Sequence, residues 1–356
     1  MDRINIKIDW WLIIPALLLA ILGLVVLRSV APDLVVYQTV FLSVAVIAFI
    51  FFAILDYQIL VALHLPIYIT SLIFLLTPFI FGSHSRGALR WLQFGQVSLQ
   101  PSEIIKPFLL LTFALLATSS YPKKGLWLIL SFILPAIIIF LQPDLGTTLV
   151  LGIGWLTIFF SQFSLRRIFF LSLTATIILL PLTGMFLKGY QKDRLLTFIN
   201  PYQDPLGKGY QVIQSVIAVG SGQFFGRGLG HGTQSQLRFL PERHTDFIFA
   251  SLSEELGFVG AGLVLILFVA LLRRIYHLSQ AATQPLVTLY CLGVLTLLTF
   301  QVFINIGMNI GLAPITGITL PFLSYGGSSL LSLGITLGLV TSMTRHTTSD
   351  SSFQIS

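Results

Sequence analysis

The residues best placed to do chemistry are acidic and basic side chains that stand beside long apolar runs. Asp246 follows Arg243 and His244 and directly precedes an apolar run that begins at Phe247. A carboxylate at this boundary can act as a general base, since neighbouring phenylalanine rings partly remove it from water. It can equally cap the helix that follows, because carboxylates favour helix N-termini. The residues alone leave both interpretations open.

Two further carboxylates, Glu254 and Glu255, lie about two helical turns beyond Asp246. Acidic side chains inside an apolar run need partners, because an unpaired charge away from water is costly. We expect these two to satisfy polar groups of the bundle rather than to perform chemistry.

Glu103 and Lys106 are spaced i, i+3 near the start of another apolar run. Ser102 is predicted to cap that helix, which places both charges on one helical face. Such a pair either neutralises itself and locks helices together or lines a polar cavity, as intramembrane ionisable residues often do. The spacing does not separate these two roles.

Arg90 and Trp91 stand side by side in the polar segment before that run. A Trp beside an Arg at a membrane interface often only anchors the protein at the headgroup level. The same pair can bind a diphosphate oxygen through the guanidinium and stack a sugar against the indole. Both interpretations fit the spacing.

The longest polar stretch runs from about 188 to 247 and is rich in Gly and Pro. A connection of this length is usually functional or disordered. Interleaved Tyr, Phe and Leu favour packing against the rest of the protein. Its cations include Arg194, Lys208 and Arg243.

A last helix-breaking segment runs from Asn305 to Ser329 at membrane depth. Irregular backbone is tolerated there only against protein or a wet cavity. Its amides and hydroxyls, including the Ser324 hydroxyl, can receive an anionic head group. The histidines are scattered and Cys291 is the single cysteine, so we predict neither a metal site nor a disulfide framework.

These candidates are exceptions in an apolar chain. Hydrophobic residues make up 55% of the 356 residues and charged residues only 9%, whereas a soluble domain carries roughly a quarter charged residues. So few polar side chains cannot cover a water-exposed surface, which predicts a protein solvated by lipid. We expect a single membrane domain over 1–356, with a polar tail from about 345 to 356.

Ten apolar runs are candidates for membrane spans of roughly 20 residues. They lie near residues 10–28, 35–55, 61–81, 102–120, 126–142, 146–162, 167–187, 248–272, 284–306 and 327–343. The predicted fold is an all-α polytopic membrane protein with about ten transmembrane helices. A large, partly helical extracytoplasmic loop, at about 188–247, is expected between the seventh and eighth spans.

Pairs of basic residues set the predicted orientation. They are Lys123 with Lys124, Arg166 with Arg167, and Arg273 with Arg274. With ten spans, all three pairs fall on the side of both termini, which the positive-inside rule makes cytoplasmic. We therefore predict an inner-membrane protein whose site faces outward. The net charge of +7 does not indicate nucleic acid, because the cations lie in short connections rather than along a stripe.

Taken together, these segments resemble a known family. The matching motifs, in chain order, are Arg90-Trp91, Gln100-Pro101-Ser102-Glu103 with Lys106, Gln142-Pro143-Asp144-Leu145-Gly146-Thr147, Asn200-Pro201-Tyr202, Gly209-Tyr210-Gln211, Gly232-Thr233-Gln234-Ser235, Leu240-Pro241-Glu242, His244-Thr245-Asp246-Phe247 with Glu254-Glu255, and Pro321-Phe322 with Ser324-Tyr325-Gly326-Gly327-Ser328. The pattern is similar to the SEDS family (shape, elongation, division and sporulation), and within it to the RodA branch more than the FtsW branch. The match runs in order through most of the chain.

The resemblance implies a peptidoglycan glycosyltransferase that polymerises lipid II into glycan strands during cell-wall elongation and rod-shape maintenance. It also implies a partner, a class B penicillin-binding protein, which is the transpeptidase that cross-links those strands. The family's essential aspartate matches Asp246, so a catalytic role is expected there. Glu103 and Lys106 match positions that are important in the family, through structure or through substrate contact.

An inverting transfer needs one carboxylate base on the acceptor hydroxyl and cations that stabilise the departing diphosphate. No cofactor is required, because the polyprenyl diphosphate already carries the activation, although a divalent cation can bridge the diphosphate. With Asp246 as the base, the predicted substrate-binding residues are Arg90, Trp91, Glu103, Lys106, Arg194, Lys208, Arg243 and Ser324.

Two other functions fit many spans and intramembrane charges. A flippase for lipid-linked precursors predicts polar residues along a path through the bilayer, whereas most polar residues here gather at one face. A non-catalytic scaffold of the elongation machinery gives no reason for an aspartate and several cations in one packed loop.

Overall fold

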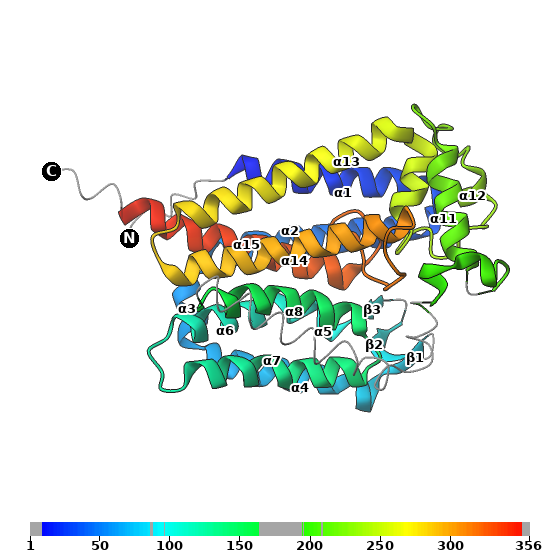
Figure 1. The fold of residues 1–356 in the computed structure, drawn as a ribbon. Coiled ribbons are helices and arrows are strands. Elements are labelled where there is room, and N and C mark those ends of the chain that lie inside the picture. The colour runs from blue at the N-terminus through cyan, green and yellow to red at the C-terminus, as the bar shows by residue number, and fades with distance from the viewer. Residues whose placement is uncertain are drawn as a thin grey trace.

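The computed structural model describes residues 9–85, 88–95, 97–163, 194, 196–207 and 209–350. Within these ranges, long helices lie side by side in a bundle, and a small sheet and short helices gather at one end of it (Figure 1). We call this the loop end. It is formed by the described residues of segments 82–100, 200–247 and 310–326.

The long helices match the predicted spans. They are α1 (Trp10–Val30), α2 (Val35–Ile54), α4 (His64–Phe81), α7 (Lys124–Leu141), α13 (Ile248–Ala281), α14 (Pro285–Asn309) and α15 (Gly327–Asp350). Seven helices of the described chain are long and apolar enough to cross a bilayer. Two shorter apolar helices are α6 (Lys106–Thr118) and α8 (Leu145–Phe160).

The all-α polytopic fold class is therefore confirmed. The predicted span at 167–187 lies outside the described residues. The other predicted spans coincide with described helical residues, and the one at 102–120 is divided into two helices at Ile105. Helix α15 continues to Asp350, past the predicted start of the polar tail near 345.

The short elements lie between the long helices. They are η1 (Pro32–Leu34), α3 (Tyr57–Ala62), α5 (Pro101–Ile104), η2 (Pro201–Gln203), α11 (Tyr210–Ser221) and α12 (Thr233–Gln236). The last three belong to the loop predicted at 188–247, and they confirm that it is partly helical.

A three-stranded antiparallel sheet at the loop end carries Arg90 and Trp91. Its strands are β1 (Ser83–Ser85), β2 (Ala88–Phe94) and β3 (Val97–Leu99), in the order β1-β2-β3. Trp91 pairs with Ser83, and Leu92 pairs with Leu99. Gly95 closes the second turn with a φ of 63°, a conformation that glycine adopts at little cost. This sheet is not predictable from the sequence pattern, since two of its strands have only three residues.

Side-chain contacts show which helix ends lie together. The ion pair between Arg274 Nε and Asp9 Oδ2 spans 2.8 Å and joins the start of α1 to the later part of α13. The Ser342 hydroxyl of α15 donates to the Leu55 carbonyl at the end of α2. The start of α1 and the described end of α15 therefore lie together, opposite the loop end (Figure 1).

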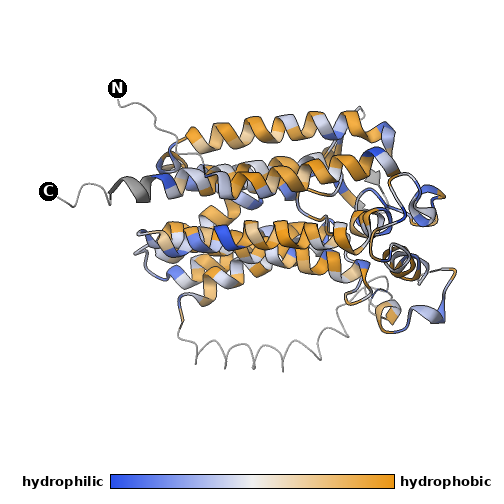
Figure 2. Cartoon of the chain, turned by 90° about the horizontal axis from the view of Figure 1, so that it is seen from above, coloured by the Kyte–Doolittle hydropathy of each residue, from blue (hydrophilic) through white to orange (hydrophobic). Residues whose placement is uncertain are grey.

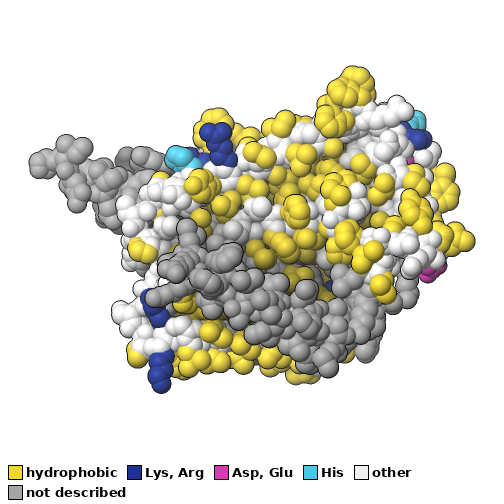
Figure 3. All heavy atoms as spheres, in the orientation of Figure 1, with side chains coloured by type: hydrophobic (Ala, Val, Ile, Leu, Met, Phe, Trp, Pro, Cys, Tyr) yellow, Lys and Arg dark blue, Asp and Glu magenta, His cyan; other side chains and the backbone are white. Residues whose placement is uncertain are grey.

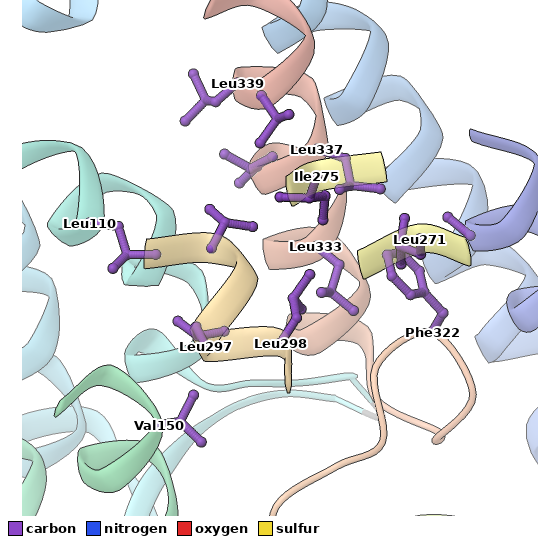
Figure 4. Close-up of a cluster of buried hydrophobic side chains, with 14 of the residues drawn as sticks. Leu110, Val150, Leu271, Ile275, Leu297, Leu298, Phe322, Leu333, Leu337 and Leu339 are labelled. Atoms are coloured by element: carbon purple, nitrogen blue, oxygen red, sulfur yellow. The ribbon is translucent and has the colours of Figure 1, made fainter. Parts of the chain in front are cut away.

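The core between the helices is built mainly from leucine. Buried side chains of α6, α8, α13, α14 and α15 meet there, including Leu110, Leu271, Leu297 and Leu333 (Figure 4). Lipid offers apolar side chains as good a solvent as a protein interior does, so close packing rather than burial holds such helices together. At Gly154 an added Cβ would lie 2.8 Å from Leu110 Cδ2, which shows how closely α6 and α8 approach.

The outer surface of the bundle is apolar. Hydrophobic residues dominate the middle of the helices and hydrophilic residues gather toward their ends (Figure 2). Exposed side chains such as Ile47, Ile80 and Ile266 face outward. On the face shown in Figure 3, Lys and Arg side chains lie near the two ends. The chain is therefore a multi-pass membrane protein.

Candidate functional site

A cavity of about 230 Å³ opens at the loop end of the bundle. Segments far apart in the sequence form it: the sheet, α5, α8, residues 244–246, α14 and residues 317–329. Among its charged and polar lining residues are Arg90, Trp91, Glu103, Asp144, Asp246 and Gln301. The predicted catalytic residue, Asp246, therefore lines the same cavity as three of the predicted substrate-binding residues, Arg90, Trp91 and Glu103.

Asp246 lines this cavity just before helix α13 begins. The N-cap of α13 is Phe247, whose side chain makes no capping hydrogen bond. Asp246 therefore stands one residue before the assigned N-cap. The buried Phe247 ring beside it is only 1% exposed.

Two buried asparagines of α14 hold the backbone at Asp246. The amides of Asn305 and Asn309 donate to the Asp246 carbonyl over 3.1 and 3.0 Å. Asn305 also donates to the Ile318 carbonyl over 2.7 Å, and Asn309 accepts from the Ala250 amide over 3.0 Å. Because Asn305 and Asn309 are four residues apart, they lie on one face of α14. That face fixes Asp246 relative to the segment around Ile318.

Ser324 lies behind the cavity lining. Its hydroxyl donates to the Thr245 carbonyl over 2.7 Å and accepts from the Leu320 amide over 2.9 Å. The backbone amide of the next residue, Tyr325, donates to the His244 carbonyl over 2.9 Å. The bonds to the His244 and Thr245 carbonyls fasten the residues just before Asp246 to the segment that follows Leu320, and the bond from the Leu320 amide closes a turn within that segment. The Ser324 hydroxyl thus serves two backbone partners and is not part of the cavity surface.

Arg90 and Asp144 form the charged pair of the cavity. Arg90 Nη1 lies 3.5 Å from Asp144 Oδ1. Asp144 also accepts from the Gln100 side chain over 2.6 Å and from the Thr147 amide and hydroxyl over 3.1 and 2.9 Å. Arg90 Nε is buried and has no hydrogen-bond partner. The pair therefore orients the guanidinium and leaves one of its donors for a ligand.

Glu103 and Lys106 form an ion pair of 2.8 Å and are both buried. Glu103 lines the cavity, whereas Lys106 lies outside the lining. The prediction that Ser102 caps this helix is wrong. The N-cap is Gln100, Pro101 takes the first helical position, and a break at Ile105 separates α5 from α6. Proline suits that first position because its fixed φ matches the helix and its missing N–H would have no partner there.

The other predicted cations lie elsewhere. Arg243 Nε donates to the Val30 carbonyl over 3.0 Å. Burial lowers the pKa of the Arg243 guanidinium, and Arg238 lowers it further. Arg194 lines a second cavity, of about 430 Å³, with Tyr210 and Gln211.

Lys208 lies outside the described residues. Within the described part of the chain, Arg90 is the predicted cation that reaches the first cavity. Also within that part, no group of three or more His, Cys, Asp or Glu side chains is placed to hold a metal ion.

Comparison with known proteins assigns the family. The model of the cell cycle protein family of FtsW, RodA and SpoVE matches residues 9–349. The chain belongs to this family. The predicted SEDS resemblance is thereby confirmed.

Relatives of this SEDS protein include named glycosyltransferases. It is 40% identical over 286 residues to the peptidoglycan glycosyltransferase MrdB of Escherichia coli (strain K12), in an alignment that covers 79% of this chain and 77% of that protein. It is 36% identical over 360 residues to stage V sporulation protein E of Bacillus subtilis (strain 168), with 95% and 97% covered.

Two solved structures share its fold. A chain from a peptidoglycan synthase complex, which coordinates polymerization and crosslinking, aligns with a TM-score of 0.82 at 34% identity. That alignment covers 96% of this chain and 98% of the other. The rod shape determining protein RodA of Thermus thermophilus aligns with a TM-score of 0.71 at 29% identity, covering 96% and 98%.

Several lining residues of this SEDS site were not among the predicted site residues. Asp144 belongs to a Pro-Asp turn between two apolar runs, so its charge at the membrane boundary was a usable signal. Gln301 lies inside an apolar run and gave a weaker one. The ring of Tyr325 lies 5.8 Å from that of His244. Burial raises the pKa of the Tyr325 hydroxyl, and Tyr37 raises it further, so this hydroxyl remains a donor at neutral pH.

Glu254 and Glu255 fasten the loop segment 230–235 instead of lining the cavity. Glu254 accepts from the amides of Gln234 and Ser235 over 2.8 and 2.9 Å. Glu255 accepts from the Gly230 amide over 3.2 Å and from the Ser29 hydroxyl at the end of α1. Both carboxylates are fully buried. The expectation that they satisfy polar groups is confirmed.

Proposed function

We propose that this SEDS protein is a peptidoglycan glycosyltransferase that polymerises lipid II into glycan strands during cell-wall elongation. One observation carries the proposal: Asp246, Arg90 and Trp91 line the same cavity at the loop end of a membrane-embedded bundle. Relatives named as peptidoglycan glycosyltransferases support it, as does the fold shared with a chain of a peptidoglycan synthase complex.

The reaction joins two disaccharide-peptides that are each linked through a diphosphate to a polyprenyl chain. The 4-hydroxyl of the acceptor sugar attacks the anomeric carbon of the donor. The new C–O bond forms as the bond from that carbon to the diphosphate oxygen breaks, and the electron pair leaves with the polyprenyl diphosphate. The hydroxyl proton passes to the carboxylate of Asp246. With one base and a direct displacement, the anomeric configuration inverts.

Arg90 is suited to stabilise the departing diphosphate. Its unpartnered Nε is a ready donor, and hydrogen bonds from a cation to a phosphate oxygen are among the stronger ones. Asp144 sets the orientation of the guanidinium before substrate arrives, so little reorganisation is needed as charge develops. Trp91 lines the same cavity and offers a ring against which a sugar can stack.

Glu103 supplies a carboxylate to the cavity, and Lys106 already balances the charge of that carboxylate. It can accept a hydrogen bond from a sugar hydroxyl without acting as the base. Roles for Lys106, Arg194, Lys208, Arg243 and Ser324 in substrate binding stay predictions. The geometry favours positioning roles for Lys106 and Ser324, because neither lines the cavity.

The proposal includes a partner protein and allows a divalent cation. A polymerase of glycan strands needs a transpeptidase to cross-link them, and we assign that role to a class B penicillin-binding protein. The lipid substrate would reach the cavity from the outer leaflet of the inner membrane. No cofactor is required, and a divalent cation can bridge the two phosphates of the substrate.

The test compares Asp246→Asn with Asp33→Asn in purified protein supplied with labelled lipid II. Asp33 is exposed in η1, also at the loop end, and does not line the cavity. Loss of a general base costs about 10²- to 10⁴-fold in rate. We therefore expect Asp246→Asn to lose at least about a hundredfold in polymerisation, with an unchanged Tm and with Asp33→Asn fully active.

Retention of near wild-type polymer by Asp246→Asn would remove Asp246 from the base role. Absence of polymer with the wild-type protein, both alone and with a purified class B penicillin-binding protein, would overturn the glycosyltransferase proposal. The same reactions with EDTA and with added Mg²⁺ measure the cation requirement.

A further inference from the structure

We infer that the cavity contains a subsite for the acetamido group of a 2-acetamido sugar, built around Gln301. The inference deepens the proposed function, since it concerns which feature of the sugar the site recognises. It begins from a buried polar atom that the protein leaves without a hydrogen bond.

Gln301 lines the cavity from α14 and is only 3% exposed. Its Oε1 is buried and has no hydrogen-bond partner. Buried polar atoms almost always have a partner, because an unpaired one costs about 1–3 kcal/mol. An unpaired buried acceptor on a residue that lines a cavity therefore points to a ligand that donates a hydrogen bond to this side chain.

The two residues that follow on the same face of α14 behave differently. The side-chain amides of Asn305 and Asn309 form hydrogen bonds with backbone groups of Asp246, Ala250 and Ile318. Gln301 lies one helical turn before Asn305, or about 6 Å along the axis. The same helix face thus positions Asp246 with two of its amides and presents a third amide to the cavity.

The chemistry of the wall beside Gln301 selects the ligand group. A glutamine side chain offers one acceptor oxygen and two N–H donors. An acetamido group offers the complement: one N–H donor, one carbonyl acceptor and a methyl group. Val150 and Ile318 also line the cavity and give the methyl group an apolar surface. A hydroxyl in the same place would supply neither the methyl group nor the carbonyl acceptor of the acetamido group.

The position of the acetamido group on the sugar agrees with this assignment. It stands on the carbon next to the anomeric carbon, so it lies close to the reacting bond. Asp246 and Gln301 line one cavity of about 230 Å³. One sugar ring can therefore place its reacting carbon toward Asp246 while its acetamido group reaches Gln301.

The test uses two lipid-linked substrates: the natural one, and an analogue whose diphosphate-linked sugar carries a 2-hydroxyl in place of the acetamido group. Each is assayed for binding, by titration of the ligand-induced rise in Tm, and for polymerisation. The proteins are wild type, Gln301→Leu, Gln301→Met and the matched control Gln280→Leu. Gln280 is an exposed residue of α13 and does not line the cavity.

We expect the wild-type protein and Gln280→Leu to prefer the natural substrate by about 10- to 100-fold, because the shorter hydroxyl of the analogue loses the carbonyl acceptor and the methyl contact of the acetamido group. In Gln301→Leu that preference should fall to within about threefold, mainly through weaker binding of the natural substrate. Gln301→Met keeps the length of the side chain and should lose the preference in the same way. It tests the subsite even if Gln301→Leu does not fold.

Two results would overturn the subsite: a wild-type protein that binds both substrates equally, or a Gln301 variant that folds and keeps the wild-type preference. If the wild-type protein makes no polymer yet binds with a preference that Gln301→Leu abolishes, the proposed function fails and the subsite stands. Binding thus separates the two failures.

Discussion

Arg90 and Asp144 illustrate, at the scale of single residues, how the cavity keeps a cation ready for an anionic ligand. Asp144 is already bonded by Gln100 and Thr147, so it does not depend on Arg90 for its partners. The 3.5 Å separation from Arg90 Nη1 is longer than that of a close ion pair. Asp144 can therefore orient Arg90 while guanidinium N–H groups of Arg90 stay available for a phosphate.

Replacement of Arg90 by lysine should reduce polymerisation by about 10- to 100-fold, because lysine keeps the charge but loses the planar array of donors. The measurement is kcat/KM with purified protein and lipid II. Arg28→Lys is the matched control, since Arg28 is exposed at the loop end of α1 and does not line the cavity. Equal activity of Arg90→Lys and wild type would mean that another cation stabilises the diphosphate.

Single residues differed in how readily the sequence revealed them. Asp246 was recognisable because a carboxylate beside a cation and an apolar run stands out in one dimension. Gln301 was not, because a lone amide in a helix gives no sign of which neighbours it meets. Its role depends on α5, α8 and residues 317–329 meeting around it, which only the tertiary structure supplies.

The break in α13 is the main feature at the scale of elements. Gly257 has φ 65° and ψ −161°, which interrupts the helix. The loop around Gln223 to Gly228 meets the backbone groups that the break releases. The amides of Arg227 and Gly228 donate to the carbonyls of Glu254 and Glu255 over 3.0 Å each, and the Phe258 amide donates to the Gln223 carbonyl over 2.9 Å. Through the break, the loop segment 223–228 is hydrogen-bonded to helix α13, which begins just after Asp246.

Gly257→Ala should destabilise this joint, by which we mean the hydrogen-bonded contact between residues 223–228 and residues 254–258 of α13. An added Cβ would lie 2.2 Å from the Gly226 nitrogen and 2.6 Å from the Phe224 carbonyl oxygen, and a positive φ costs a residue with a side chain about 1–3 kcal/mol. We expect the Tm to fall by about 5 °C and polymerisation to fall with it, since the joint lies between the loop and Asp246.

Gly262→Ala on the same helix is the control. An added Cβ there meets no atom within 4 Å, so the change should be neutral or stabilise the helix by up to about 1 kcal/mol. Equal Tm values for the two variants would show that the joint does not constrain the loop.

The long apolar elements were predictable and the joints between them were not. Runs of about twenty apolar residues identify spans, because lipid requires every backbone group to be bonded within the helix. The apolar run at 248–272 contains Gly257, but the run itself does not reveal that a loop donates to its carbonyls. The sheet that carries Arg90 was missed for a related reason: its pairing is set by contacts between short segments.

At the scale of the whole molecule, the charge distribution distinguishes the two ends of the bundle. Arg274 pairs with Asp9 at the end opposite the loops. The short connection between α6 and α7 lies at that same end (Figure 1), and Lys123 and Lys124 stand where it enters α7. Basic residues in short connections mark the cytoplasmic side. The cavity lies at the other end, which would face outward and receive substrate from the outer leaflet.

This orientation predicts which residues a membrane-impermeant thiol reagent can reach in intact cells. Cys291, the single cysteine, is buried, so the wild-type background should be low. Leu206→Cys places a thiol at a loop-end residue that is 89% exposed, and Tyr121→Cys places one between α6 and α7 at a residue that is 51% exposed. Leu206→Cys should react in intact cells, whereas Tyr121→Cys should react only after the membrane that holds the protein is opened. The reverse pattern would put the loop end in the cytoplasm, where a cavity that polymerises an extracytoplasmic glycan has no access to its acceptor strands.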